Sequence, residues 1–459
     1  MRKPDVLVSK FELLSVAVAL LLVGILVLQP SIRGIDGFGN YVYIASILKS
    51  GDLDFTDDYR AYDKSHDFPF KLADLPVYPG TGLPTNRYGI GTSLFWSPFV
   101  IPLHYLLNMI DPGSADTLGR PYEWAVSIGT LFWGSFGLWL LYRRMRKDAP
   151  RWACSLALFG VIFATPLGFY LYAHGSMSHG ISFFLAVCSL LQFERTWHQP
   201  DPESMALCGL IMSLLVMTRF QDITWSIVVG IALVVRMFTY KTKRNKINNN
   251  PYIGLLSMAL IGFLTFLPQM LTWKILYGSI LSGPTPYLEG SAGEFSYWPY
   301  HLIAVLISER GGVIAWHPLY AFAICGLALS FFKKDAYWII ALVGLIGFVA
   351  QLYLISSWSI WWAGASFGNR FFISSLPFLI FGLITLILQI SKSVGRSVAI
   401  IGVALLGIWN MGLLLQYFAQ MVPREDEIPW SQVIKQNLFD IPQYIWEKLY
   451  NIISNYVHL

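Results

Sequence analysis

The sequence predicts an all-α polytopic membrane protein. Of its 459 residues, 55% are hydrophobic and only 13% are charged, and the mean hydropathy is +0.54. Soluble globular domains carry about 25% charged residues, so most of this chain is expected to lie in lipid. Its apolar residues also gather in runs of roughly 20 residues, the length that an α-helix needs to cross a bilayer.

The apolar runs divide the chain into about eleven predicted transmembrane helices. Almost every run is followed by a short polar or basic segment, as expected where a helix leaves the bilayer. The candidate runs lie near residues 11–29, 91–109, 121–142, 152–170, 180–193, 205–218, 223–240, 252–273, 312–331, 336–356, 371–390 and 397–420.

The run at 91–109 is predicted to be a juxtamembrane or re-entrant helix that does not span. It contains Pro98 and Pro102, and it also holds polar side chains that are costly in hydrocarbon. Without this span, the basic clusters all fall on the side of the N-terminus, and Lys and Arg favour the cytoplasmic side. These clusters are residues 143–147, 241–246, 333–334 and 392–396.

This topology predicts a cytoplasmic N-terminus and two regions. Residues 1–420 form the transmembrane domain, with a first outer loop at 30–120 that carries juxtamembrane helices. Residues 421–459 form a periplasmic amphipathic tail, because their apolar residues recur at helical spacing but are too few to span. We expect a multi-pass protein of a bacterial inner membrane. The sequence has no basic face or nucleic-acid motif, so a nucleic-acid partner is not expected.

The first outer loop carries Asp36 shortly after the first apolar run. The residues that follow alternate as in an amphipathic helix lying along the membrane. A carboxylate at the lipid–water boundary is partly desolvated, which is expected to raise its basicity. Such a group can accept a proton from a hydroxyl or amine. The alternative is that Asp36 only caps the helix.

Several motifs, in order along the chain, resemble those of the GT-C glycosyltransferase superfamily. They are "GDLDF", "NRYGIGTSLFWSPF", "ATPLGFYLYAHGSMSHGISFF", "MTRFQD" and "WWAGASFGNRFFISSLP". The superfamily includes protein O-mannosyltransferases, the lipid A aminoarabinose transferase and the catalytic subunit of oligosaccharyltransferase. The resemblance implies a GT-C fold, a sugar donor on a polyprenyl phosphate, and a catalytic role for Asp36. Many members carry a second acidic residue directly afterwards, where this chain has Gly37.

Three arginines are candidates for binding the donor phosphate. Arg87, Arg219 and Arg370 lie at predicted outer membrane boundaries, against the usual sign bias. Arginine is always charged and can bind phosphate oxygens in a bidentate manner. The alternative for each is an ion pair within the protein, for example between Arg219 and Asp222.

A further set of residues is predicted to lie near the substrates. Each has a plainer interpretation as a solvated loop residue, a helix cap or part of an interfacial aromatic belt. No cofactor is required by the motifs. A divalent metal is neither required nor excluded: the second outer loop offers histidines that could bind one, but no carboxylate. The set is His174, His179, Asp57, Asp58, Trp362 and Glu294.

Together these features predict an inverting hexosyl- or pentosyltransferase. It would move a sugar from a polyprenyl-phosphate donor to a glycan, lipid or protein acceptor on the outer face, with Asp36 as the base. One alternative is a polytopic lipid or glycan transporter or flippase; another is a glycan polymerase or ligase outside the superfamily. Transporters usually place charges and broken helices near the midplane, whereas the polar residues here gather at one boundary.

Overall fold

The fold is all-α, as predicted. The structure is a computed structural model that describes residues 10–457 except 67–70, 240–250, 283–292 and 424–425. Within these ranges the only β features are two isolated bridges. The α-helices are α1 (Lys10–Val27), α2 (Gly34–Lys49), α3 (Thr56–Ser65), α4 (Gly91–Ile110), α5 (Arg120–Met145), α6 (Arg151–Phe163), α7 (Leu167–Tyr172), α8 (His179–His198), α9 (Pro202–Thr218), α10 (Ile223–Thr239), α11 (Pro251–Tyr277), α13 (Leu302–Ile307), α14 (Val313–Trp316), α15 (Leu319–Lys333), α16 (Trp338–Ser356), α17 (Leu376–Ser393), α18 (Arg396–Phe418), α19 (Trp430–Lys435) and α20 (Ile441–Val457).

Seven described helices are long and apolar enough to cross a membrane. They include α4, α5, α10, α11, α16, α17 and α18. Four shorter apolar helices, α1, α6, α9 and α15, coincide with further predicted spans. The membrane character of the chain is therefore confirmed, whereas the count of eleven spans stays a prediction.

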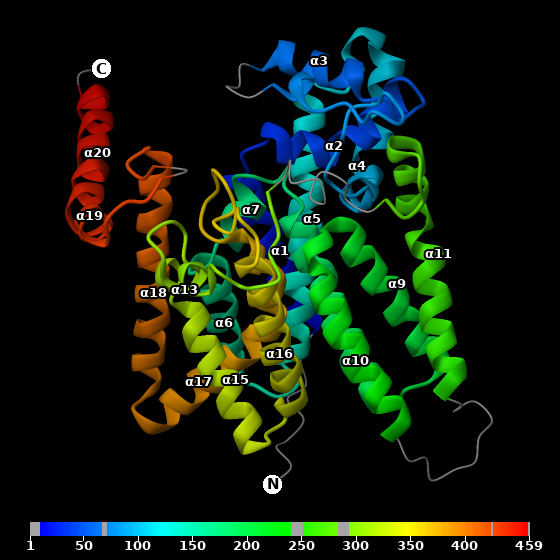
Figure 1. Cartoon of the computed structure of the whole chain (residues 1–459). Coiled ribbons are helices and arrows are strands. Elements are labelled where there is room, and N and C mark those ends of the chain that lie inside the picture. The colour runs from blue at the N-terminus through cyan, green and yellow to red at the C-terminus, as the bar shows by residue number, and fades with distance from the viewer. Residues whose placement is uncertain (1–9, 67–70, 240–250, 283–292, 424–425, 458–459) are drawn as a thin grey trace.

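The bundle has a basic end, defined by Arg144, Arg146, Lys333 and Arg396. Arg146 pairs with Glu12 at the start of α1, with Nε 2.7 Å from Oε1. Lys333 donates to Gln389 over 2.8 Å, and the Arg396 guanidinium lies 4.6 Å from the Trp152 ring. Figure 1 shows the turn between α17 and α18 at the bottom, and α2 and α3 at the top. Three predicted basic clusters thus share one end; the fourth, 241–246, lies outside the described residues.

Helix α4 runs antiparallel to the first half of α5. Trp96 Nε1 donates to Thr130 Oγ1 over 2.9 Å, and His104 Nδ1 lies 2.8 Å from Tyr122 Oη. Its first residue, Gly91, packs on the backbone of Met217 at the end of α9. Both ends of α4 therefore lie at the α2 end of the bundle, and neither reaches the basic end. Helix α4 is nevertheless one of the seven helices long and apolar enough to cross, so the absence of a crossing at 91–109 stays a prediction.

Small residues let the helices of the core approach closely. A Cβ atom at Gly326 of α15 would collide with the backbone of Gly382 of α17, and one at Gly209 of α9 would collide with α11. Since lipid supplies no hydrophobic drive between spanning helices, such close backbone contact is a main source of their packing energy. Helix α17 is mostly buried and forms the centre of this half of the bundle.

The C-terminal region is helical, as its periodicity predicted. Helix α19, a π-helical turn (Gln436–Asp440) and α20 follow α18. The side chain of Gln416 in α18 donates to Val433 O over 3.2 Å, and Asn437 Nδ2 donates to Trp409 O over 3.1 Å. Trp446 of α20 is 70% exposed. The boundary at 421 and the periplasmic side of this tail stay predictions.

The topology can be tested with single cysteines in a cysteine-free background. Lys64→Cys in α3 and Pro112→Cys after α4 are both exposed positions, and both should react with an impermeant thiol reagent added outside intact cells. Lys333→Cys at the basic end is the control, and it should react only after permeabilisation. Labelling at 64 but not at 112 in intact cells would show that α4 crosses.

Candidate active site

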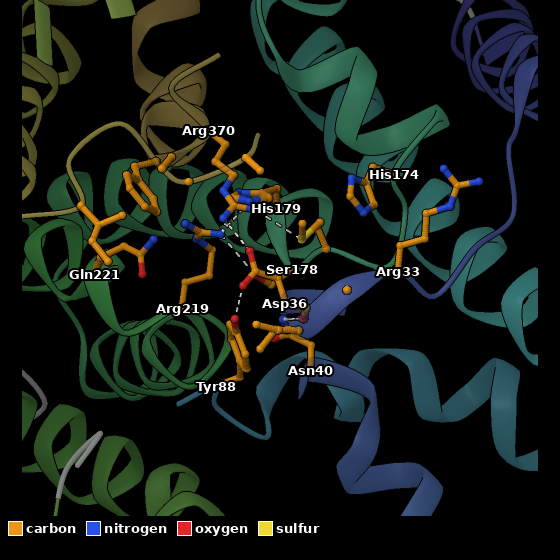
Figure 2. A pocket seen from close by; sticks show the side chains of 18 of the residues that line it. Arg33, Asp36, Asn40, Tyr88, His174, Ser178, His179, Arg219, Gln221 and Arg370 are labelled. Carbon is orange, nitrogen blue, oxygen red and sulfur yellow. Dashed lines mark hydrogen bonds and ion pairs between the residues drawn. The ribbon is translucent and has the colours of Figure 1, made fainter. Parts of the chain in front are cut away.

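A cavity of about 560 Å³ opens among loops at the α2 end of the bundle. It lies between the start of α2, the loop before α4, the turn between α7 and α8, the turn after α9, and the segment before α17. Figure 2 shows that side chains from these segments point toward one another. Its lining includes Arg33, Asp36, Arg87, Tyr88, His174, His179, Arg219, Trp358, Trp362 and Arg370.

Asp36 is the carboxylate at the centre of this cavity. Its Oδ2 lies 2.5 Å from Arg370 Nη2, and its Oδ1 lies 3.9 Å from Arg87 Nη2. Tyr88 Oη donates a short hydrogen bond to Oδ1. The first turn of α2 has its N-cap at Arg33, without a side-chain cap. The interpretation of Asp36 as a simple helix cap is therefore wrong, because its side chain faces Arg370 and Tyr88.

The surroundings of Asp36 make it a weaker base than the sequence suggested. Burial alone would raise its pKa, but the charges of Arg370 and Arg87 and the Tyr88 hydrogen bond outweigh burial. The pKa of Asp36 is therefore held well below its usual value. The expectation of raised basicity was wrong, because it considered desolvation without the arginines that supply the opposite effect.

Glycines allow α2 to approach the loop before α4. A Cβ at Gly39 would collide with the Tyr88 ring, and one at Gly37 would lie 2.7 Å from Ser176 Oγ. Asn86 also donates its side-chain amide to Gly39 O over 2.9 Å. A side chain at position 37 would therefore require Ser176 to shift.

Arg219 belongs to a second charged group beside Asp36. Its Nε lies 3.9 Å from Asp222 Oδ2, so the ion pair considered from the sequence is present. Asp222 is completely buried and accepts hydrogen bonds from Ser182 and Ser374 over 2.6 and 2.7 Å. The Arg219 guanidinium also contacts His179 Nδ1 at 2.7 Å.

The guanidinium groups of Arg219 and Arg370 are neighbours. The guanidinium carbon of each lies 5.9 Å from the centre of the Phe371 ring. Arg370 Nε is buried and has no hydrogen-bond partner among the described residues. Four arginines (Arg33, Arg87, Arg219, Arg370) and one carboxylate, Asp36, line the cavity. Because Asp222 beside the cavity pairs with Arg219, the formal surplus is two positive charges.

Both candidate histidines line the cavity. Burial and the Arg370 charge lower the pKa of His174 to about 4, so this imidazole is neutral at physiological pH. Its Nε2 is buried without a partner among the described residues. The same part of the chain holds no group of three or more His, Cys, Asp or Glu side chains placed for a metal ion.

The other candidates are divided between the cavity and the surface. Trp362 lines the cavity, and the Arg310 guanidinium stacks 3.6 Å from its ring centre. Asp57 is exposed beside Arg60, at 3.5 Å, and Asp58 lies 3.7 Å from Lys49. Glu294 is exposed, and only its backbone pairs with Ser359, over 2.8 Å in each direction. Asp57, Asp58 and Glu294 are absent from the cavity lining.

Tyr88 and Arg33 are site residues that the sequence analysis missed. Tyr88 is held by its own backbone, which accepts from Tyr43 Oη over 2.5 Å and donates to Asn86 Oδ1 over 3.1 Å. The signal for Tyr88 was its place beside Arg87 in "NRYGIG". Arg33 carried the same signal as the three candidate arginines, because it also lies at a predicted outer membrane boundary.

No family model matches the chain, and no curated protein matches it. Two solved structures of the oligosaccharyltransferase of Archaeoglobus fulgidus are similar in fold. The enzyme AglB in complex with an inhibitory peptide and a dolichol-phosphate has a TM-score of 0.38 at 13% identity, with 94% of this chain and 54% of that chain covered. The complex with Zn and sulfate has a TM-score of 0.40 at 14% identity, with 86% and 54% covered.

This chain therefore spans about half the length of these neighbours. At these TM-scores the similarity is distant and concerns only the overall path of the chain.

The buried Asp222 network should be essential for folding. Asp222→Ala removes the shared acceptor of Ser182 and Ser374 and the partner of Arg219, which should destabilise the protein by about 3–5 kcal/mol. The matched control is Asp57→Ala, which removes an exposed partner of Arg60 and should change the stability by less than about 0.5 kcal/mol. Thermal unfolding in detergent compares the two, and equal stability of both variants would contradict a structural role for Asp222.

Proposed function

We propose that the protein is a GT-C glycosyltransferase that takes a sugar from a polyprenyl-phosphate donor. The observation that carries this proposal is the cavity in which one carboxylate, Asp36, is surrounded by arginines with a surplus of positive charge. A cavity of this kind suits substrates that bring an anionic group and a nucleophile that must lose a proton as it attacks. A sugar phosphate ester with an incoming hydroxyl or amine meets that description.

In the proposed reaction the acceptor attacks the anomeric carbon of the donor sugar. A new C–O or C–N bond forms, the bond from the anomeric carbon to the phosphate oxygen breaks, and the phosphate leaves with the electron pair. The acceptor proton passes to Asp36. Arg370 and Arg219 stabilise the charge of the departing phosphate, since donors placed where charge develops lower the barrier. Attack opposite to the leaving phosphate inverts the anomeric carbon.

The ion pair between Asp36 and Arg370 is an inactive arrangement of the base in this proposal. A carboxylate whose charge is already neutralised by Arg370 and Arg87 has little affinity for a proton. When the donor phosphate binds, it competes for the same guanidinium groups and brings negative charge near Asp36. Both effects raise the basicity of Asp36, so the base becomes active when the donor is in place.

The proposed active site faces the outer side of the membrane. The α2 end, which holds the cavity, is opposite to the basic end, and Lys and Arg favour the cytoplasmic face. Trp358 and Trp362 on the cavity wall offer apolar ring faces on which a sugar can stack. A transporter of the same lipid would bind it without consuming it, so a transfer assay separates these two functions.

Substitutions of Asp36 and Arg370 should separate chemistry from donor binding. Asp36→Asn should reduce transfer by at least about 100-fold, yet bind the donor as well as the wild type or more tightly, since a negative charge is removed. Arg370→Ala should weaken donor binding by roughly 30- to several-thousand-fold. Arg370→Lys should restore only part of it, because it lacks the bidentate fork.

The measurements are turnover of a polyprenyl-phosphate sugar and affinity for a non-hydrolysable donor analogue in nanodiscs. Arg60→Ala, at an exposed position outside the cavity, is the control and should behave as the wild type. Near-normal turnover in Asp36→Asn would remove this residue from the mechanism. Unchanged donor affinity in both Arg370→Ala and Arg219→Ala would show that these arginines are structural.

The exchange of ion pairs predicts a difference between two pH profiles. In the donor-free enzyme the pKa of Asp36 is low. On acidification, kcat/KM for the donor should therefore begin to fall only at low pH. In the donor-bound enzyme the pKa is raised, so kcat should fall at a higher pH during acidification. Coincident acid limbs in the two profiles would contradict the exchange. Arg87→Gln should reduce the difference between the pH values at which kcat/KM and kcat fall, because the pKa of Asp36 in the donor-free enzyme rises when the Arg87 charge is removed.

A further inference from the structure

A second cavity, of about 470 Å³, lies at the basic end of the bundle, far from the proposed active site. It is formed by the last turns of α5 and α8. Its lining combines basic side chains with two leucines, Leu140 and Leu191. The basic residues that line it are Arg143, Arg144, Lys147, Arg195 and His198.

Both carboxylates that line this cavity, Asp148 and Glu194, form ion pairs with Arg144. Arg144 Nη1 lies 2.5 Å from Asp148 Oδ2, and Nε of the same side chain donates to Glu194 Oε2 over 2.6 Å. Among the described residues, no carboxylate pairs with Arg143, Lys147 or Arg195, and all three side chains are exposed. The cavity thus presents three uncompensated positive charges around a hollow, which is the electrostatic pattern of an anion site.

An apolar face of α5 leads directly to these charges. Ile128, Phe132 and Phe136 are 40%, 40% and 38% exposed, respectively, and they follow one another at intervals of four residues along one side of the helix. The Phe136 ring stacks on Trp139 with 5.6 Å between centres. The Arg143 guanidinium lies 5.8 Å from the Trp139 ring. The same face therefore changes from hydrocarbon-like to cationic at the basic end.

We propose that this cavity binds the phosphate headgroup of an anionic phospholipid, with an acyl chain along the exposed face of α5. Arg143, Lys147 and Arg195 contact the headgroup, while Leu140, Leu191 and the aromatic face hold the chain. Basic pockets between membrane helices are known sites for anionic headgroups. A soluble phosphate compound would contact only the basic side chains, and the exposed apolar face of α5 would then have no ligand. The site is independent of the proposed glycosyl transfer.

The experiment compares two triple variants of the full chain in detergent. Arg143→Gln/Lys147→Gln/Arg195→Gln removes the three charges of the cavity. Lys333→Gln/Lys334→Gln/Lys392→Gln is the matched control, because it removes three charges at the ends of neighbouring helices but none from the cavity. Binding of phosphatidylglycerol, cardiolipin and phosphatidylcholine is measured by native mass spectrometry and by the shift of the unfolding temperature. Glycerol 3-phosphate is the soluble competitor.

The wild type should retain phosphatidylglycerol or cardiolipin in preference to phosphatidylcholine. The cavity variant should bind the anionic lipids roughly 100-fold more weakly, at about fivefold for each charge, and the control should change by less than about threefold. Should the triple variant fail to fold, Lys147→Gln and Arg195→Gln are measured singly, each with about a fivefold loss expected. Equal losses in cavity variant and control would overturn the proposal, as would competition by glycerol 3-phosphate at concentrations equal to those of the lipid.

Discussion

The ion pair between Asp36 and Arg370 is the contact on which the arrangement of the cavity depends. It joins the first turn of α2 to the segment that leads into α17, two elements that are far apart in the sequence. A partly buried charge without a partner is costly, so either residue alone would destabilise the site. The ion pair stabilises both charges, and together with the hydrogen bond from Tyr88 it keeps Asp36 ionised. In the proposed reaction, the same contact makes Asp36 a weak base until the donor phosphate competes for Arg370.

The helices provide a rigid frame, and the reactive groups stand at their ends. Asp222 shows how the frame is fixed at this level, because its buried carboxylate joins α8 through Ser182 and the segment before α17 through Ser374. Arg219 extends from the same turn toward the cavity. Side chains held in this way lose little entropy when a substrate binds, and this lowers the cost of recognition.

Charge has a different task at each end of the bundle. At the basic end, Glu12 and Glu194 each pair with an arginine from the end of α5, which ties α1 and α8 to that helix. At the α2 end, the arginines outnumber the single carboxylate of the cavity, so positive potential stays available for an anion.

The sequence by itself determined the all-α membrane class and the positions of most helices, and it singled out Asp36, Arg87, Arg219 and Arg370, which line one cavity. Length and hydropathy suffice for the first two, because hydrocarbon demands continuous apolar helices. The four charged residues could be singled out because they lie at predicted membrane boundaries. Only the tertiary structure decided which charges meet. The pKa of Asp36 depends on Arg370, Arg87 and Tyr88 together, and a local pattern in the sequence does not contain distances between residues that folding brings together from different segments.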